Sequence, residues 1–189
     1  MARVHRLICT GALWLAMMTG LGSLAAVPAH AEKVMDLATF LVTYRCGVVN
    51  RLQALHANTE PAMKEHRWLA ITRDGGDQSY VQCMFNDDSR QMWCEAASGY
   101  YSTGPDEPRK IWLSLPVKAS LSALGFDTSI EKGNYPRYID TVRSQDIDAA
   151  ADLLLSALYL AYGARDTTPI TLTAARGLNV RLQPCAPIS

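Results

Sequence analysis

The sequence predicts an α+β domain in which an antiparallel sheet of four to five strands carries helices packed on one face. Apolar residues first recur at three- and four-residue steps, over residues 33–57, which is typical of an amphipathic helix. They then alternate with polar residues over 67–115, between turn sequences, which is typical of antiparallel strands. A long and almost wholly apolar helix follows near the C-terminus. Helices grouped around an antiparallel sheet define the α+β class.

The first helix is predicted over residues 33–57, and Asn58 and Pro61 end it. Cys46 lies well round this helix from the centre of the apolar stripe, so we expect it to flank the core. The stripe comprises Val34, Leu37, Leu41, Tyr44, Val48, Leu52 and Leu55.

Four strands are predicted in the central part of the chain. Asp74-Gly75-Gly76-Asp77 separates the first two, because paired glycines tolerate the positive φ of a tight turn. A second turn, Asp87-Asp88-Ser89-Arg90, leads into the third strand. Three or more strands with one covered face can be stable. The predicted strands cover residues 67–73, 79–86, 91–101 and 110–115.

The last third of the chain is predicted to return to helix. Ser144 is a suitable N-cap for a helix that runs to about Tyr162, with Asp146 and Asp148 near its positive end. This helix is almost solidly apolar, so we expect it to be buried on more than one side. The remaining predicted elements are a short helix over 116–124 and strands over 135–142 and 170–173.

The N-terminal residues have the features of a secretory signal peptide. Arg3 and Arg6 precede an uncharged apolar run over residues 7–27, and Ala29-His30-Ala31 fits the small-residue cleavage pattern. The alternative is an uncleaved membrane anchor, because the run approaches bilayer-spanning length. The cleavage pattern and three glycines within the run favour removal after Ala31.

A signal peptide over residues 1–31 leaves a single α+β domain with a C-terminal tail, residues 32–189. We expect a periplasmic or secreted location in a bacterium, without a stable membrane anchor after cleavage. Cleavage removes two of the 18 basic residues and none of the 18 acidic residues, so the mature formal charge is −2. This balance argues against a nucleic-acid partner, which would require a basic stripe.

Four cysteines remain after cleavage: Cys46, Cys83, Cys94 and Cys185. An even number in an oxidising compartment predicts two disulfides. A metal site is the alternative reading, but the chain has no Cys-x-x-Cys spacing and neither mature histidine lies beside a cysteine. We therefore expect structural disulfides, with no metal and no cofactor.

The predicted disulfides join Cys83 to Cys94 and Cys46 to Cys185. Cys83 and Cys94 are spaced symmetrically about the second turn. If that turn is a four-residue loop, they face each other at a non-hydrogen-bonded pair, where Cα atoms approach to about 4.5 Å. Cys46 then holds the tail at Cys185. The rival pairing links Cys46 to a strand cysteine across the core.

Four stretches resemble one family through their order and spacing, over residues 33–173. They resemble TY-Chap domains, relatives of type III secretion chaperones and of YbjN-like proteins. The resemblance implies a type III secretion chaperone-like fold, with helices on one face of a curved antiparallel sheet, and a non-enzymatic peptide- or protein-binding role. Typical members are cytoplasmic and lack these cysteines, so this chain departs from them. The stretches are Tyr80-Val81-Gln82, Glu95-Ala96-Ala97-Ser98, Leu121–Phe126 with Gly133–Arg137, and Asp152–Leu158 with Tyr162-Gly163.

Catalytic motifs are missing from the sequence. His56 and His66 are the histidines of the mature chain, and no nucleophile elbow or phosphate-binding loop accompanies them. The acidic pairs of the two turns do not follow a calcium-loop pattern, and aspartate favours turns for backbone reasons alone. We therefore expect a protein that is not an enzyme.

Aromatic residues concentrate in the predicted third and fourth strands. Trp93 alternates with Cys94, so it lies with Glu95 on the open face if helices cover the cysteine side. Aromatic side chains on an open face can hold a peptide or a partner subunit. Alternatively, the tail or a second chain covers them. The candidate partner-binding residues are Trp93, Glu95, Tyr100, Tyr101 and Trp112.

The leading hypothesis is an exported, non-enzymatic module of chaperone-like fold that binds a peptide or protein, including a second copy of the chain. One alternative is a structural or envelope-stress protein without a ligand, in which the disulfides serve persistence outside the cell. A small secreted enzyme is the third hypothesis.

Export is expected to produce a mature chain that begins at Glu32, because the cleavage pattern ends at Ala31. Intact-mass measurement on protein isolated from the cell envelope checks this. A mass that includes residues 1–31 would contradict it and would favour the membrane anchor.

Overall fold

The computed structural model describes residues 35–58, 60, 66–102, 111–165, 168–175 and 178–185. The predicted signal peptide lies outside these residues. Within them, no helix has the length and apolar character needed to cross a membrane. The elements in chain order are α1 (Leu37–Ala57), β1 (Trp68–Arg73), β2 (Tyr80–Phe85), β3 (Gln91–Ala96), α2 (Leu115–Ala123), β4 (Tyr135–Asp140), α3 (Ser144–Leu160), β5 (Ile170–Ala174) and β6 (Leu178–Arg181).

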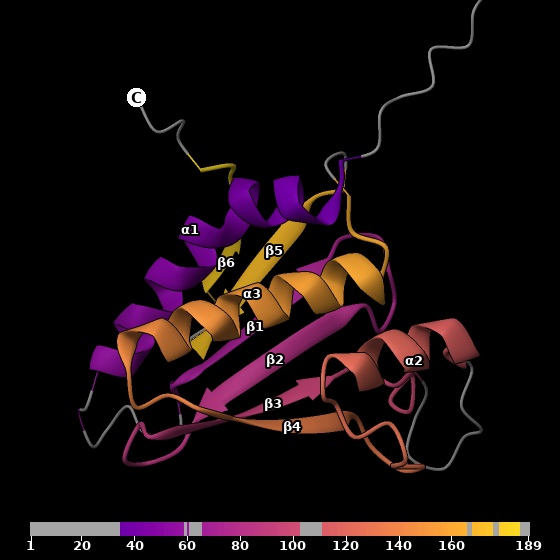
Figure 1. Cartoon of the computed structure of the whole chain (residues 1–189), viewed down its shortest axis with the longest axis horizontal. Coiled ribbons are helices and arrows are strands. Elements are labelled where there is room, and N and C mark those ends of the chain that lie inside the picture. The colour runs from indigo at the N-terminus through magenta and orange to yellow at the C-terminus, as the bar shows by residue number, and fades with distance from the viewer. Residues whose placement is uncertain are drawn as a thin grey trace, which may run out of the picture. The chain divides into compact units, whose positions relative to one another are not determined.

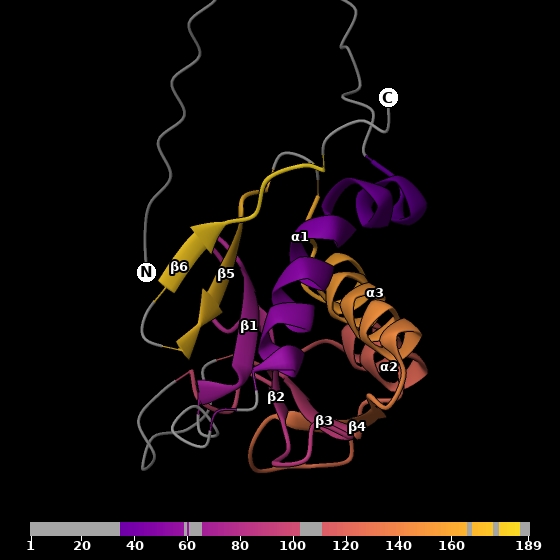
Figure 2. The same ribbon diagram turned by 90° about the vertical axis from the view of Figure 1, so that its left-hand side faces the viewer.

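The six strands form one antiparallel sheet in the order β4-β3-β2-β1-β5-β6. The α+β class and the helices packed on the sheet are as predicted, and the sheet has more strands than the expected four to five. The three helices lie on the same face of the sheet (Figures 1 and 2). The chain leaves the edge strand β4, crosses this face as α3 and returns as β5 beside β1.

The helix α1 begins later than the sequence indicated, at Leu37 instead of residue 33. Asp36 is its N-cap, and the carboxylate accepts a hydrogen bond from the Thr39 N–H at 2.8 Å. The buried stripe is also rotated relative to the predicted one, because Phe40 replaces Leu41 in it. Residues four apart share one side of a helix, and the buried set is Phe40, Tyr44, Val48 and Leu52.

The helix α3 is buried on more than one side, as its composition predicts. It contacts β1, β2 and β4 below it and packs against α1 and α2. The predicted N-cap, Ser144, is instead the first helical residue, and Arg143 precedes it as the N-cap. The Asp146 carboxylate accepts a hydrogen bond from the Arg143 backbone N–H at 2.8 Å and pairs with its guanidinium. These contacts lower the pKa of Asp146.

Two predicted strand boundaries were wrong. The third strand ends at Ala96 instead of residue 101, because Ser98 and Gly99 turn the chain away from the sheet. The Ser98 hydroxyl donates to the Gly133 carbonyl at 2.6 Å, and Gly99 has a positive φ of 80°. The fourth predicted strand, 110–115, does not form within the described residues, because 111–114 are an extended segment and α2 begins at Leu115.

The C-terminal segment adds a strand that the sequence did not predict. The short strand β6 pairs with β5, and the chain then folds back over α1. Leu182 is buried against Gly47 of α1, where an added Cβ would lie 2.5 Å from Leu182 Cδ1. Because Gly47 has no side chain, Leu182 can pack directly against the backbone of α1.

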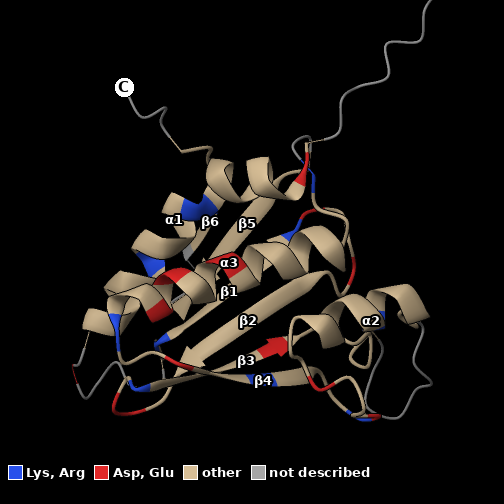
Figure 3. Ribbon diagram, in the orientation of Figure 1, with Lys and Arg blue, Asp and Glu red and all other residues tan. Residues whose placement is uncertain are grey.

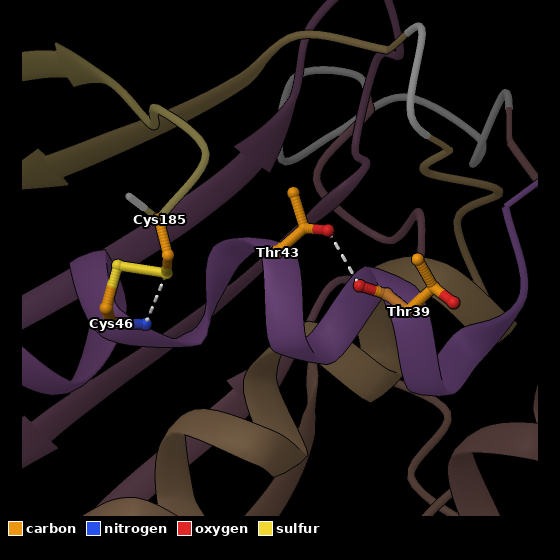
Figure 4. Close-up of a disulfide and its surroundings, with 4 residues drawn as sticks. All are labelled: Thr39, Thr43, Cys46 and Cys185. Atoms are coloured by element: carbon orange, nitrogen blue, oxygen red, sulfur yellow. Dashed lines mark hydrogen bonds between the residues drawn. A yellow bond between two sulfur atoms is a disulfide. The ribbon is translucent and has the colours of Figure 1, made fainter. Parts of the chain in front are cut away.

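Both disulfides join the cysteines that the sequence paired. Cys83 and Cys94 face each other in β2 and β3 with a Cα–Cα distance of 4.0 Å. Cys46 of α1 is joined to Cys185, and its backbone N–H also donates to the Cys185 sulfur at 3.2 Å (Figure 4). The tail is thereby fastened to the helix layer.

Replacing Cys46 and Cys185 together by serine should lower the free energy of unfolding by about 4–5 kcal/mol. The bridge spans 139 residues, and a loop of that length restricts the unfolded chain strongly. Urea unfolding of the wild type and the double variant measures the difference, with Asn50→Ala on the exposed side of α1 as the control. A loss below about 1 kcal/mol would contradict the expected restriction of the unfolded chain by this bridge.

Candidate functional site

The sheet has one face under the helices and one open face. On β2 and β3 the residues under the helices are fully buried, whereas the alternating residues are not. Trp93 is 36% exposed and Met84 is 39% exposed. Trp93 and Glu95 therefore lie on the open face, as the sequence predicts. The buried set on these two strands is Val81, Cys83, Phe85, Met92, Cys94 and Ala96.

An apolar row crosses four strands of the open face. Trp68 pairs with Met84, Met84 with Trp93, and Trp93 with Tyr138, so side chains from β1, β2, β3 and β4 stand side by side. Tyr138, on the edge strand, is 66% exposed. Large apolar side chains that are exposed together commonly mark a contact surface. We refer to these four residues as the apolar row.

A hollow of about 250 Å³ opens beside the apolar row. Its aromatic walls include Trp68 and Trp93, and Glu95 and Gln82 supply its polar groups. Glu95 and Gln82 are cross-strand partners, and Gln82 Nε2 donates to Glu95 Oε2 at 2.8 Å. The described lining residues are Trp68, Gln82, Cys83, Met84, Trp93 and Glu95.

A polar network occupies the other end of this face. The Asn134 side-chain amide donates to the Tyr80 hydroxyl at 2.9 Å, and its carbonyl oxygen accepts from the Ser98 N–H at 3.4 Å. Burial raises the pKa of the Tyr80 hydroxyl above its ordinary value. The network ties β2 to the segments that follow β3 and precede β4. It has a structural role at the end of the sheet.

The predicted site residues do not all meet. Tyr100 and Tyr101 lie in the turn after β3, with ring centroids 5.0 Å apart, and Trp112 lies in the extended segment before α2. Their placement on the third and fourth strands was wrong, because neither strand extends that far. Of the five candidates, Trp93 and Glu95 line the described hollow.

Four residues of this face were missed by the sequence reasoning. Gln82 and Met84 alternate with buried residues in β2. Trp68 begins β1 ahead of three buried residues, and Tyr138 is exposed between two half-buried residues of β4. The alternation was visible in the sequence. Their assembly depends on pairing between strands, and β4 had no predicted neighbour.

The polar residues considered for other chemistry have structural roles here. His56 Nε2 lies 3.2 Å from the Thr141 carbonyl oxygen, and its ring packs edge-on against Phe85. The Asp74 carboxylate accepts from the Thr171 hydroxyl at 2.8 Å. Asp88 accepts from the Arg90 N–H within the second turn. Across the described segments, no three metal-ligating side chains come together.

A second hollow, of about 480 Å³, lies beside the tail disulfide. It is bounded by α1 on one side and by β6 and the tail on the other, and Arg51 and Arg181 are among its lining residues. None of its described lining residues is aromatic. The open face of the sheet is the stronger candidate.

Comparison of the chain with family models, curated proteins and solved structures found no match. The resemblance to TY-Chap domains therefore stays a prediction.

Trp93→Ala should cost clearly less folding free energy than a truncation in the core, because Trp93 is 36% exposed on the open face. Met92→Ala, one residue away and fully buried, should cost about 2–5 kcal/mol. Denaturant unfolding of the two variants checks the contrast. Equal losses would place Trp93 in the core and remove the open face from consideration.

Proposed function

We propose that the protein is an exported, non-enzymatic binding module that holds a peptide or protein segment against the open face of its sheet. The observation that carries this proposal is the apolar row, where Met84, Trp93 and Tyr138 are all substantially exposed beside a hollow. Tryptophan and tyrosine are the residues most enriched among those that dominate binding energy at protein interfaces.

The distribution of residues on the open face supports the proposal. On the β5–β6 side of the sheet, the residues of this face are polar, because Thr171 and Thr173 pair with Arg181 and Asn179. On the β1–β4 side, the apolar row stands in the corresponding place. Scattered apolar residues are ordinary on a protein surface, but large aromatic side chains gathered on one half of a face are typical of a contact surface.

The described tail does not cover this row. The chain after β6 turns to the helix side, where Cys185 is bonded to Cys46 of α1. Among the described residues, the helices also lie on that side (Figure 2). A separate molecule is therefore the occupant that we propose.

The face is better suited to binding than the neighbouring edge. In β4, Pro136 has no N–H, and its carbonyl already accepts from the Asp127 N–H at 2.9 Å. The Thr141 N–H donates to the Arg90 carbonyl, so the odd-numbered residues of β4 direct their backbone groups toward β3. The backbone groups of the even-numbered residues Tyr138 and Asp140 therefore face outward from the sheet edge. This leaves a short edge for an added strand, and proline is a common means of blunting an edge.

The alternative is an envelope protein without a ligand, and the two disulfides favour it because they stabilise the domain regardless of any partner. It leaves the apolar row without a role. The two hypotheses therefore predict different effects of a Trp93 substitution on binding.

A partner identified by mass spectrometry from an envelope extract should bind Trp93→Ala at least about tenfold more weakly than the wild type, as expected for a tryptophan at an interface centre. Val42→Ala is the matched control, because Val42 is 75% exposed on the helix layer. Surface plasmon resonance with the purified partner measures both affinities.

Equal partner affinity in the wild type, Trp93→Ala and Val42→Ala, or an equal loss of affinity in both variants, would contradict binding at the open face. Self-association that is lost in Trp93→Ala alone would identify a second copy of the chain as the partner.

A further inference from the structure

Glu95 is an acidic side chain on the open face that has no ion-pair partner within the described segments. The ion pairs between described residues join Arg45 to Asp148 and Asp152, and Arg143 to Asp146. Among the described residues, Gln82 is the donor to the Glu95 carboxylate and uses Oε2, which leaves Oε1 without a described donor. A carboxylate with an unused oxygen can accept a donor from a ligand.

The half of the open face that holds the apolar row also carries negative charge. In the described strands β1–β4, two charged side chains point to the open face, and both are acidic: Glu95 and Asp140. Each alternates along its strand with residues that lie under the helices. Arg137 does not compensate them, because it pairs with Cys94 and lies on the helix side near Gly125. The charge of this half therefore favours a cationic partner.

The hollow combines this charge with two indole rings. Trp68 and Trp93 line it together with Glu95. Cations are attracted to the faces of aromatic rings, and tryptophan is the strongest partner among them. A carboxylate that lines the same hollow as two tryptophans attracts a cation more than either kind of group does alone.

The size of the hollow limits what it can hold. Its volume of about 250 Å³ is below the roughly 300–1,000 Å³ of sites that bury whole drug-sized ligands. One long side chain is a better match, with the rest of its peptide lying along the apolar row. The guanidinium of arginine is planar, stacks on aromatic rings and is less strongly hydrated than the ammonium of lysine.

We propose that the hollow between Trp68 and Trp93 binds an arginine side chain of an extended peptide segment, with Glu95 as its charge partner. This inference rests on the proposed function, because it names the chemistry of the segment that the open face holds. Gln82 positions the Glu95 carboxylate through the hydrogen bond across β2 and β3.

The test uses the purified protein and three acetylated pentapeptides with amidated C-termini. Each has one central arginine, lysine or glutamine flanked by alanines. Binding is followed by NMR at the indole N–H signals, which are assigned with Trp68→Phe and Trp93→Phe. The arginine peptide should shift the Trp68 and Trp93 signals with a Kd on the order of 1 mM, as expected for one side chain in an open site. The lysine peptide should bind more weakly, and the glutamine peptide should produce no saturable shift.

Glu95→Gln should weaken binding of the arginine peptide by about tenfold, because a charge-assisted contact is replaced by a neutral one. The matched control is Asp140→Asn, which removes an acidic charge from the same face but outside the described lining of the hollow. It should change the affinity by less than about twofold. Raising the salt concentration should weaken binding to the wild type and not to Glu95→Gln.

Several outcomes would overturn the inference. These are equal binding of the glutamine peptide, unchanged affinity in Glu95→Gln, or equal losses in both charge variants. Shifts produced as strongly by tetramethylammonium would assign the hollow to small ammonium compounds instead of arginine. Partner binding that is weakened in Trp93→Ala but unchanged in Glu95→Gln would overturn the arginine site and leave the proposed function standing.

Discussion

The pairing register between β2 and β3 determines which side chains lie under the helices and which lie on the open face. Side chains alternate along a strand, so a slip of one residue would exchange the two faces of the strand that slips. A slip of β2 would move Val81 and Phe85 out of the core, whereas a slip of β3 would move Trp93 into it. Two contacts hold the register: the Asn86 N–H donates to the Gln91 carbonyl at 2.9 Å, and Cys83 is bonded to Cys94 at a directly opposed pair.

The turn between these strands is itself fastened to α1 by a buried arginine. The Arg67 guanidinium is almost fully enclosed and donates to the carbonyls of Leu55 and Asn86, each at 3.2 Å, and to the Ser89 hydroxyl. Desolvation lowers the pKa of Arg67. A buried cation requires such a set of hydrogen-bond acceptors. Because Arg67 takes its acceptors from both the turn and α1, it fixes the position of the turn relative to the helix layer. Register and helix packing are therefore coupled.

The elements that could be predicted from the sequence are those whose pattern is local. The glycine pair, the four-residue turn and the alternation in β2 and β3 act over a few residues, and so does the apolar run of α3. The cysteine pairing followed from the same local symmetry about the turn. Trp93 and Glu95 could be assigned to the open face for this reason, without knowledge of the neighbouring strands.

The missed elements depend on contacts between distant segments. The strand β6 is four residues long and pairs with β5 alone, and its position depends on Leu182 against Gly47 and on the tail disulfide. Residues 110–115 have the apolar character of a strand, yet Trp112 is 71% exposed and Leu115 is 82% exposed. An apolar run does not reveal whether a sheet is available to receive it, and here Ser98 and Gly99 direct the chain elsewhere.

The placement of the stabilising contacts also bears on the proposed function. The tail disulfide and the ion pairs of Arg45 lie in the helix layer, and the Cys83–Cys94 bridge is buried beneath it. Among the described residues, few charged side chains lie on strands, and most lie on helices, turns and connecting segments (Figure 3). The open face can therefore present aromatic side chains on a backbone that is held from the other side. A surface held in this way loses little conformational freedom when a ligand binds, which conserves binding free energy for the few contacts that one extended segment can make.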